Sequence, residues 1–337
     1  MTYMSWRTVN LFHFWHCRDS GEMAELTNFT EYLTEKMIRD LYCSKRFTAG
    51  QVHNELIFLS VLNTLLATSA FLGNTLILVA LRKESSLHPP FKLMYCNLAI
   101  TDLCVGIVAE PLCVVYFMSV VNETWDVCLN THLILAITGT ILCAESLVTV
   151  AAISVDRLLA LSLGLRYRQV ITLKRAYTAV IVMWVLSIAC TSSYFWNPPI
   201  YQYSAHITIA LCLLISVFSY TKIIFTLRHN QIHTMLQGHN CGQGPPSQSL
   251  IIAKYRKAVY SGLWVQGTLF ICYLPHGIAV ALTPQRGMDI SLYLVRQFTL
   301  TLVYFNSSLN PFLYCWKARE VRRAVRRTLR QLFCSSS

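Results

Sequence analysis

The sequence predicts an all-α membrane protein, a seven-transmembrane helix bundle followed by a short cytoplasmic amphipathic helix. Of its 337 residues, 54% are hydrophobic and only 13% are charged, whereas soluble domains carry about 25% charged residues. The apolar residues also gather in seven runs of about 20 residues or more, the length that a helix needs to cross a hydrocarbon core of about 30 Å. Helices satisfy their own backbone hydrogen bonds in lipid, so each run is expected to be helical.

The seven runs give the chain its expected organisation. They cover residues 56–81, 92–118, 131–161, 176–196, 204–227, 258–282 and 291–314. Pro111, Pro275 and Pro311 lie inside runs, and each should kink its helix because it removes a backbone hydrogen bond. We expect an extracellular N-terminal segment over 1–55, the membrane domain over 56–316, and a cytoplasmic amphipathic helix and tail over 317–337.

Basic residues predict the orientation of the bundle. The connections after the first, third and fifth runs and the C-terminal tail hold almost all of them, whereas the connections after the second and fourth runs hold none. By the positive-inside rule, the N-terminus is extracellular and the C-terminus cytoplasmic. The glycosylation sequons at Asn28 and Asn122 then both lie outside. This distribution explains the net charge of +12 without a nucleic-acid partner, and we expect none.

Two cytoplasmic segments stand out by composition. Residues 229–254 contain a stretch rich in Gly, Pro and Ser and are expected to form a flexible loop. Residues 317–333 alternate basic and apolar side chains, which is typical of an amphipathic helix on the anionic inner leaflet, with membrane lipids as partners. Cys334 is a candidate palmitoylation site. A basic tail without an attached lipid is the alternative.

The third run carries ionisable groups that a lone membrane anchor would not hold. Glu145 and Ser146 lie near its middle, and Asp156 and Arg157 lie near its end. A charged side chain at membrane depth is costly and usually faces protein or water, so these groups are functional candidates inside a multi-helix bundle.

Short motifs occupy corresponding places in the runs. They are Gly73-Asn74, Leu98-Ala99-Ile100-Thr101-Asp102, Asp156-Arg157-Leu158, Trp184, Cys272-Tyr273-Leu274-Pro275, and Asn306-Ser307-Ser308-Leu309-Asn310-Pro311-Phe312-Leu313-Tyr314. In this order, across seven runs, they resemble the rhodopsin-like (class A) G-protein-coupled receptors over residues 56–334. Leu165-Arg166-Tyr167, the short connection after the fourth run and the absence of proline from the fifth run resemble the group of melanocortin, adenosine, cannabinoid and lysophospholipid receptors.

The resemblance implies a plasma-membrane receptor, not an enzyme, that passes an extracellular ligand signal to heterotrimeric G proteins. Three alternatives stay open. One is a receptor-like protein that has lost G-protein coupling. Another is a transporter or proton-coupled channel using Asp102, Glu110 and Glu145, although the sequence has no inverted repeat to support it. The third is a seven-span lipid hydrolase, which would need clustered histidines where this chain has scattered ones.

A carboxylate near the bilayer midplane is the first candidate site. Asn74, Ser146, Asn306, Ser307 and Asn310 could converge on Asp102 and form an oxygen-rich cage suited to a small hard cation. The resemblance implies an allosteric sodium ion held by Asp102, Ser146, Asn306 and Asn310, and no other cofactor. A protonated Asp102 in a polar network without sodium is the alternative.

The resemblance implies an activation switch at the inner side of the bundle. Arg157 pairs with Asp156 at rest and swings toward the G protein on activation, with Tyr220 and Tyr314 behind it. The remaining switch residues are Tyr273, Pro275, Asn310 and Pro311. The family often adds an acidic partner at the inner end of the sixth span, but residues 254–257 include no carboxylate. We therefore expect ligand-independent signalling. An interfacial charge pair without a switching role is the alternative for Asp156 and Arg157.

Two departures from the family pattern concern the sixth span and the outer disulfide. Tyr273 stands where relatives carry tryptophan, and its effect on activation is open. The family links the outer end of the third span to the loop after the fourth, but that loop, about 197–203, has no cysteine. Cys128 can instead pair with Cys43 or Cys17. We expect a Cys43–Cys128 bridge, with free thiols as the alternative.

The ligand is constrained mainly by exclusion. Residues 138–140 lack the aspartate of amine receptors, and the seventh span lacks the lysine that binds retinal. The acidic cluster of melanocortin receptors is incomplete, with Glu110 near one of its positions. A peptide, lipid or nucleoside-like ligand is therefore expected over an amine. The candidate ligand-binding residues are Glu110, His132, Gly139, Thr140, Cys143, His276, Gln297 and Tyr304. Glu145 and His206 are further polar candidates, which could equally be packing residues.

Overall fold

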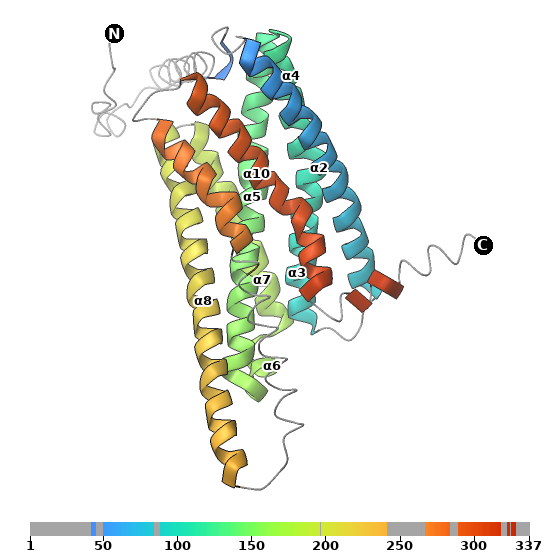
Figure 1. Cartoon of the computed structure of the whole chain (residues 1–337), viewed down its shortest axis with the longest axis vertical. Coiled ribbons are helices and arrows are strands. Elements are labelled where there is room, and N and C mark those ends of the chain that lie inside the picture. The colour runs from blue at the N-terminus through green and yellow to red at the C-terminus, as the bar shows by residue number, and fades with distance from the viewer. Residues whose placement is uncertain are drawn as a thin grey trace, which may run out of the picture.

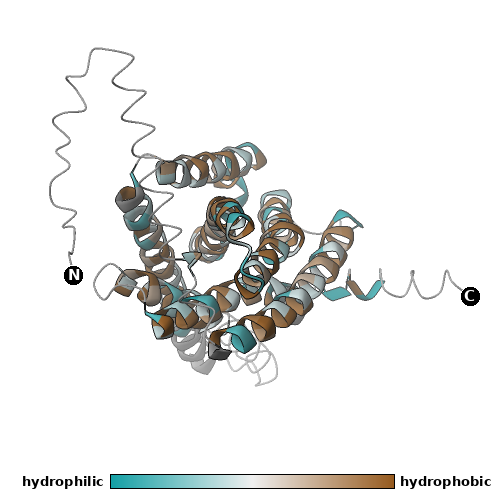
Figure 2. Ribbon diagram, turned by 90° about the horizontal axis from the view of Figure 1, so that it is seen from above, coloured by the Kyte–Doolittle hydropathy of each residue, from teal (hydrophilic) through white to brown (hydrophobic). Residues whose placement is uncertain are grey.

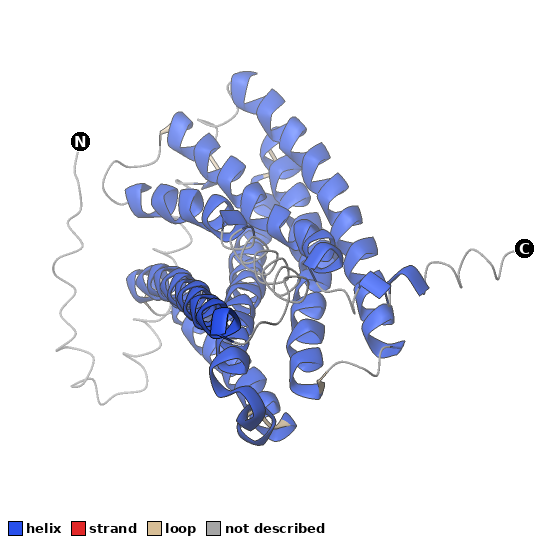
Figure 3. Ribbon diagram, turned by 60° about the horizontal axis from the view of Figure 1, so that its bottom comes forward, coloured by secondary structure: helices blue, strands red, loops and turns tan. Residues whose placement is uncertain are grey.

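The described chain is a bundle of long helices. The computed structural model describes residues 42–44, 50–83, 88–195, 197–240, 264, 267–283, 289–317, 322–323 and 325–327. Within these ranges the elements are helices joined by short turns, with no strand (Figure 3). The all-α prediction is therefore confirmed.

Seven helical segments of the described chain correspond to the seven predicted spans (Figure 1). They are α2 (Gly50–Lys83), α3 with η2 and α4 (Pro89–Cys104, Val105–Ala109 and Glu110–Val121), α5 (Trp125–Leu163), α7 (Leu173–Ser192), α8 (Pro198–Asn240), the helix Gly267–Thr283, and α10 (Ile290–Lys317). Short elements join them: η3 (Gly164–Arg166), α6 (Tyr167–Val170) and η4 (Ser193–Phe195).

Five of these segments are long and apolar enough to cross a membrane: Val52–Lys83, Pro89–Val121, Trp125–Val170, Leu173–Phe195 and Ile200–His229. The helix Gly267–Thr283 is a shorter apolar helix, and α10 interrupts its apolar residues with polar ones such as Arg296, Asn306 and Asn310. Large apolar side chains remain exposed along α7 and α8, and Figure 2 shows apolar ribbon on the outer surface of the bundle. Such a surface suits lipid, and the protein is a multi-pass membrane protein.

The second span contains a π-helical turn where its proline falls. Pro111 cannot donate a backbone hydrogen bond to the residue four places earlier. The preceding segment η2 widens into a π-helix, and the Glu110 amide donates to the Val105 carbonyl. A π-bulge of this kind accommodates an extra residue without ending the helix. Gly106 lies in this turn against α2, where a Cβ would come within 3.0 Å of the Ala67 carbonyl oxygen.

Two predicted connections are helical in the structure, so these two predictions are wrong in part. The expected flexible loop 229–254 is helical through Asn240, where α8 ends. The connection predicted at 197–203 is also mostly helix, because α8 begins at Pro198. Proline suits the first turn of a helix, and residues 231–237 contain no glycine or proline to stop one. As a result α8 extends below the other helices in Figure 1.

The bundle has two separate apolar cores, called inner and outer here after the orientation that the basic residues predict. The inner core gathers buried residues such as Leu98, Leu147, Leu269 and Tyr273, and Val325 of the C-terminal segment joins it. The outer core surrounds Tyr116, Phe117, Tyr293 and Tyr304. Arg326 and Arg327 are exposed beside buried Val325, as in an amphipathic helix. Most of the predicted helix 317–333 and Cys334 lie outside the described residues.

Candidate functional site

Asp102 lies in a buried polar cluster that joins three spans. Its side chain is fully buried in α3. The Ser146 hydroxyl of α5 donates to Oδ1 at 3.0 Å, and the Asn310 amide of α10 donates to Oδ2 at 2.7 Å. Ser307 of α10 forms a further side-chain hydrogen bond with this carboxyl group. The cluster therefore connects the second, third and seventh spans through one carboxylate.

Two asparagines extend this cluster toward α2. The Asn74 amide donates to the Ala70 carbonyl at 2.9 Å and to the Ser307 carbonyl at 3.1 Å, while its Oδ1 has no hydrogen-bond partner within the described chain. Asn306 is also buried, and its Nδ2 likewise has no partner there. Buried polar atoms are usually paired, so this region has hydrogen-bonding capacity to spare.

Tyr273 connects the sixth span to the same cluster. It is buried, and its hydroxyl donates to the Cys143 carbonyl of α5 at 3.4 Å. The same hydroxyl can instead donate its proton to Ser146, whose own hydroxyl donates to Asp102. The hydroxyl that distinguishes this residue from the tryptophan of relatives is therefore the group that makes these contacts.

The inner end of α5 carries a compact charge pair. Arg157 Nη2 donates to Asp156 Oδ2 at 2.9 Å, and the Tyr167 hydroxyl of α6 donates to the other oxygen of Asp156 at 2.6 Å. The Arg157 guanidinium lies 3.5 Å from the centre of the Phe91 ring, a cation–π contact. Its side chain is 41% exposed. Within the described residues, no carboxylate other than Asp156 forms an ion pair with Arg157.

The remaining switch residues are placed unevenly. Tyr220 of α8 forms a side-chain hydrogen bond with Ser154, near Arg157. Pro311 packs against α2, where a Cβ on Gly73 would approach its Cγ to 2.8 Å. Pro275 lies inside the helix Gly267–Thr283. The side chain of Tyr314 and residues 254–257 lie outside the described part of the chain.

Glu145 belongs to a satisfied packing network. Asn97 of α3 donates to its Oε1 at 3.0 Å, and Ser187 of α7 donates to Oε2 at 3.4 Å. Asn97 also donates to Thr149 and accepts from the Trp184 indole at 3.0 Å. The network joins α3, α5 and α7. His206 also lies in a packing contact: its ring nitrogens face the Gln202 and Gly277 carbonyls, and a neutral ring donates to one of them.

A disulfide fixes a short N-terminal segment over the outer end of the bundle. The Cys43–Cys128 bridge is present as predicted, with the two Cα atoms 5.9 Å apart. It holds Tyr42 against α5, where the tyrosine ring stacks on His132 with ring centres 4.3 Å apart. The Tyr116 hydroxyl of α4 donates to the Tyr42 carbonyl at 3.4 Å. His132 therefore lies in contact with the segment that the disulfide holds over the bundle.

The predicted ligand-binding residues divide into a central group and a side group. In the central group, a Cβ on Gly139 would come within 2.7 Å of the Tyr304 hydroxyl, so glycine makes room for that buried tyrosine. Thr140 contacts the Tyr201 hydroxyl at 2.7 Å. Glu110 is fully buried, and neither of its oxygens has a partner within the described residues. Cys143 lies between this group and Tyr273, and its carbonyl accepts a hydrogen bond from the Tyr273 hydroxyl.

His276 and Gln297 form the side group, at the contact between the sixth and seventh spans. His276 Nδ1 contacts the Thr299 hydroxyl at 3.2 Å, and Gln297 is buried. Arg296, which is not among the residues predicted from the sequence, also lies here. Its Nη1 donates to the Thr283 hydroxyl at 2.9 Å, and its guanidinium lies 5.1 Å from the centre of the Tyr42 ring. The sequence does carry a signal for this residue, because Arg296 is a basic residue in the otherwise uncharged seventh run, 291–314.

Residues 73–196 match the family model of the 7 transmembrane receptor (rhodopsin family). The match extends from Gly73 in the first span to the end of the fourth, and it includes Asp102, Arg157 and Trp184. It supports a rhodopsin-like receptor class for the chain, and the members of that class are receptors and not enzymes.

Proposed function

We propose that the protein is a plasma-membrane G-protein-coupled receptor, with the N-terminus extracellular, that converts ligand binding into activation of a heterotrimeric G protein. The observation that carries the proposal is the connection of four spans through Asp102, Ser146, Asn310 and Tyr273. When the helices move, the hydrogen bonds buried between them can exchange partners together. They therefore suit a two-state bundle whose populations a ligand shifts.

The contacts of Arg157 support basal activity. An exposed ion pair is worth about 0.2 to 1 kcal/mol, and an exposed cation–π contact about 0.5 to 1 kcal/mol. Together they hold Arg157 at rest by about 0.7 to 2 kcal/mol, a preference of roughly three- to thirty-fold. Leaving Asp156 and Phe91 therefore costs little, and a measurable share of molecules signals without ligand.

We further propose that the Asp102 cluster binds an allosteric sodium ion. Asp102, Ser146, Asn310 and Asn306 would hold it, and the unpartnered Asn74 Oδ1 supports the fit because it is an oxygen ligand without a donor. A carboxylate offers about four lone-pair sites, so its three donors, Ser146, Asn310 and Ser307, leave capacity for a cation. The ion would stabilise the negative charge of Asp102 in the membrane interior.

The group of receptors to which the chain belongs is a separate proposal. We propose that the chain falls among the melanocortin, adenosine, cannabinoid and lysophospholipid receptors. The very short connection before α8 and the lack of proline between residues 200 and 240 support this.

The test is ligand-free nucleotide exchange on a panel of G proteins, in membranes that contain the full chain. Wild type is compared with Arg157→Ala at matched surface expression, in buffers with sodium or with choline. We expect one G protein to respond to wild type and not to Arg157→Ala. We also expect sodium to lower wild-type exchange and to leave Asp102→Asn unchanged.

Each negative outcome has its own meaning. Silence of wild type on every G protein, at good surface expression, contradicts basal activity and favours a receptor-like protein without coupling. Equal exchange by wild type and Arg157→Ala removes Arg157 from the switch. Equal sodium inhibition of wild type and Asp102→Asn excludes Asp102 as the sodium ligand.

A further inference from the structure

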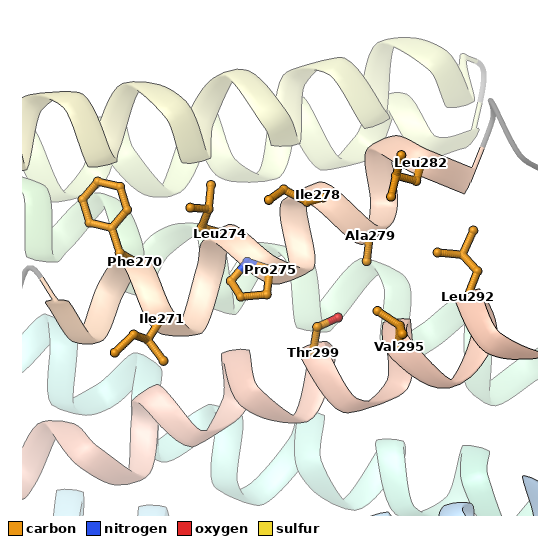
Figure 4. A pocket seen from close by; sticks show the side chains of 10 residues that line it. All are labelled: Phe270, Ile271, Leu274, Pro275, Ile278, Ala279, Leu282, Leu292, Val295 and Thr299. Carbon is orange, nitrogen blue, oxygen red and sulfur yellow. The ribbon is translucent and has the colours of Figure 1, made fainter.

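An apolar groove runs along the outside of the bundle between the helix Gly267–Thr283 and α10. It has a volume of about 500 Å³. Figure 4 shows Val295 and Thr299 of α10 pointing toward Ala279 and Pro275 of the opposite helix. Thr299 is the one polar residue in its lining. A groove of this composition suits hydrocarbon and not water.

The groove opens toward the surface that faces lipid. Ile271, Ile278 and Val295 line it and are 64%, 52% and 49% exposed. Along the helix it extends from Phe270 to Leu282, a rise of about 18 Å. Half of a hydrocarbon core is about 15 Å. The groove is therefore about as long as one leaflet is thick.

A cation lies between the two helices, just beyond the last residues that line this groove. Arg296 follows Val295 on α10, and its Nη1 reaches across to Thr283, the neighbour of Leu282 on the other helix. Its second contact is the ring of Tyr42. Among the described residues, no Asp or Glu forms an ion pair with Arg296. A guanidinium held by a hydroxyl and a ring retains several donors for a carboxylate or phosphate.

We propose that this groove binds an acyl lipid with an anionic headgroup, taken from the outer half of the bilayer. The headgroup contacts Arg296, and the chain lies between Pro275, Ala279 and Val295 toward Phe270. The proposal deepens the receptor function proposed above and rests on it for the statement that this lipid is the ligand. Charge at one end and an apolar, membrane-facing channel below it match such a molecule better than a peptide or nucleoside.

The groove is also connected to the proposed switch. Pro275 lines it directly, and Thr299 of its lining contacts His276. Tyr273, whose hydroxyl reaches the Asp102 cluster, lies two residues before Pro275 on the same helix. A chain that fills the groove therefore presses on the helix that carries Tyr273.

Photolabelling tests the binding without any G protein. The full chain is placed in nanodiscs of zwitterionic phosphatidylcholine and labelled with a photoreactive palmitic acid or with the photoreactive alcohol of the same chain. Val295→Trp fills the groove, and Val182→Trp on α7 is its matched control, because Val182 is a lipid-facing valine with 47% exposure. Arg296→Gln removes the charge.

We expect the fatty acid to label peptides from 267–283 and 290–299 at least tenfold more than the alcohol does. Arg296→Gln should lower fatty-acid labelling about tenfold and change alcohol labelling less than twofold. Val295→Trp should abolish the site-specific label, and Val182→Trp should leave it unchanged. Lysophosphatidic acid should displace the probe, and lysophosphatidylcholine should not.

Equal labelling by acid and alcohol, or labels spread evenly over the lipid-facing helices, would show bulk lipid only and overturn the proposal. Nucleotide exchange with added palmitic acid separates this result from the receptor function. Labelling in the groove without any change in exchange keeps the binding site and contradicts its signalling role. Basal exchange that depends on Arg157, without labelling in the groove, keeps the receptor and excludes this ligand.

Discussion

Tyr273 is the residue where the chain departs most clearly in its chemistry from the receptors that it resembles. Tryptophan at this place offers one donor on a large ring, whereas tyrosine offers a hydroxyl that both donates and accepts. In this protein the hydroxyl contacts Cys143 and Ser146 of α5. The sixth span is thereby hydrogen-bonded to the third at membrane depth, next to Asp102.

Replacing Tyr273 with phenylalanine should raise ligand-free nucleotide exchange. The change removes the hydroxyl and keeps the ring, so the hydrogen bonds that hold the helix Gly267–Thr283 to α5 are lost. A net hydrogen-bond contribution of about 0.5 to 1.5 kcal/mol corresponds to a rise of about two- to tenfold at matched surface expression. Tyr203→Phe, at an exposed position, should change nothing. Lower exchange in Tyr273→Phe would contradict the holding role.

At the scale of single residues, the sequence predicts the functional residues that their own chemistry makes recognisable. It misses residues whose role depends on neighbours in the folded structure. Asp102 and Arg157 were selected because a charge in an apolar run requires explanation whatever surrounds it. Cys43 was identified because few outer cysteines were left to choose from. Arg296 and Tyr42 were missed because each gains its role from the other, across more than two hundred residues. Glu145 was an open candidate until Asn97 and Ser187 proved to satisfy it.

Among the helices, the contact of α2 with α10 depends on a missing side chain. A Cβ at Gly73 would lie 2.8 Å from Pro311 Cγ, and a proline ring cannot move away as a flexible chain end could. The motif Gly73-Asn74 therefore contributes a close approach as well as a polar group. It brings Asn74 within 3.1 Å of the Ser307 carbonyl on α10.

Gly73→Ala should destabilise the protein by about 1 to 3 kcal/mol, the usual cost of overpacking. Thermal unfolding in detergent is the measurement. Gly277→Ala is a fitting control, because a Cβ there meets only Ile209 at 4.0 Å, and alanine has the higher helix propensity. If the two variants unfold at the same temperature as wild type, the α2–α10 contact is looser than its geometry indicates.

Element boundaries were harder to predict than the elements themselves. Runs of apolar residues locate the spans because a helix must be long enough to cross the bilayer. Outside the bilayer, no such requirement determines where a helix ends. For that reason α8 continues to Asn240 through residues that read as polar loop. The π-helical turn η2 was equally hidden, since a proline predicts a disturbed helix without specifying a kink or a bulge.

The orientation of the whole molecule can be tested at one exposed turn. Asn122 lies between α4 and α5, on the outer side if the basic residues are cytoplasmic, and it is exposed. In cells, Asn122→Gln and Thr124→Ala should each remove one glycan that peptide N-glycosidase F releases, whereas Thr124→Ser should keep it. A mobility shift on gels measures this. An unglycosylated Asn122, together with labelling of Asn122→Cys by a thiol reagent from the cytosolic side, would reverse the assigned orientation.

The link between Cys43 and Cys128 reports on the same orientation through redox chemistry. Disulfides persist in the secretory lumen and at the cell surface, whereas the cytosol keeps thiols reduced. We therefore expect the end of the bundle with this bridge to face the oxidising side, an expectation that uses no count of charges. The bridge also holds Tyr42 over His132 and Arg296. Purification with a strong reductant would break the bridge and release that segment. The redox state of the buffer therefore decides whether the segment covers the outer end of the bundle or leaves it open.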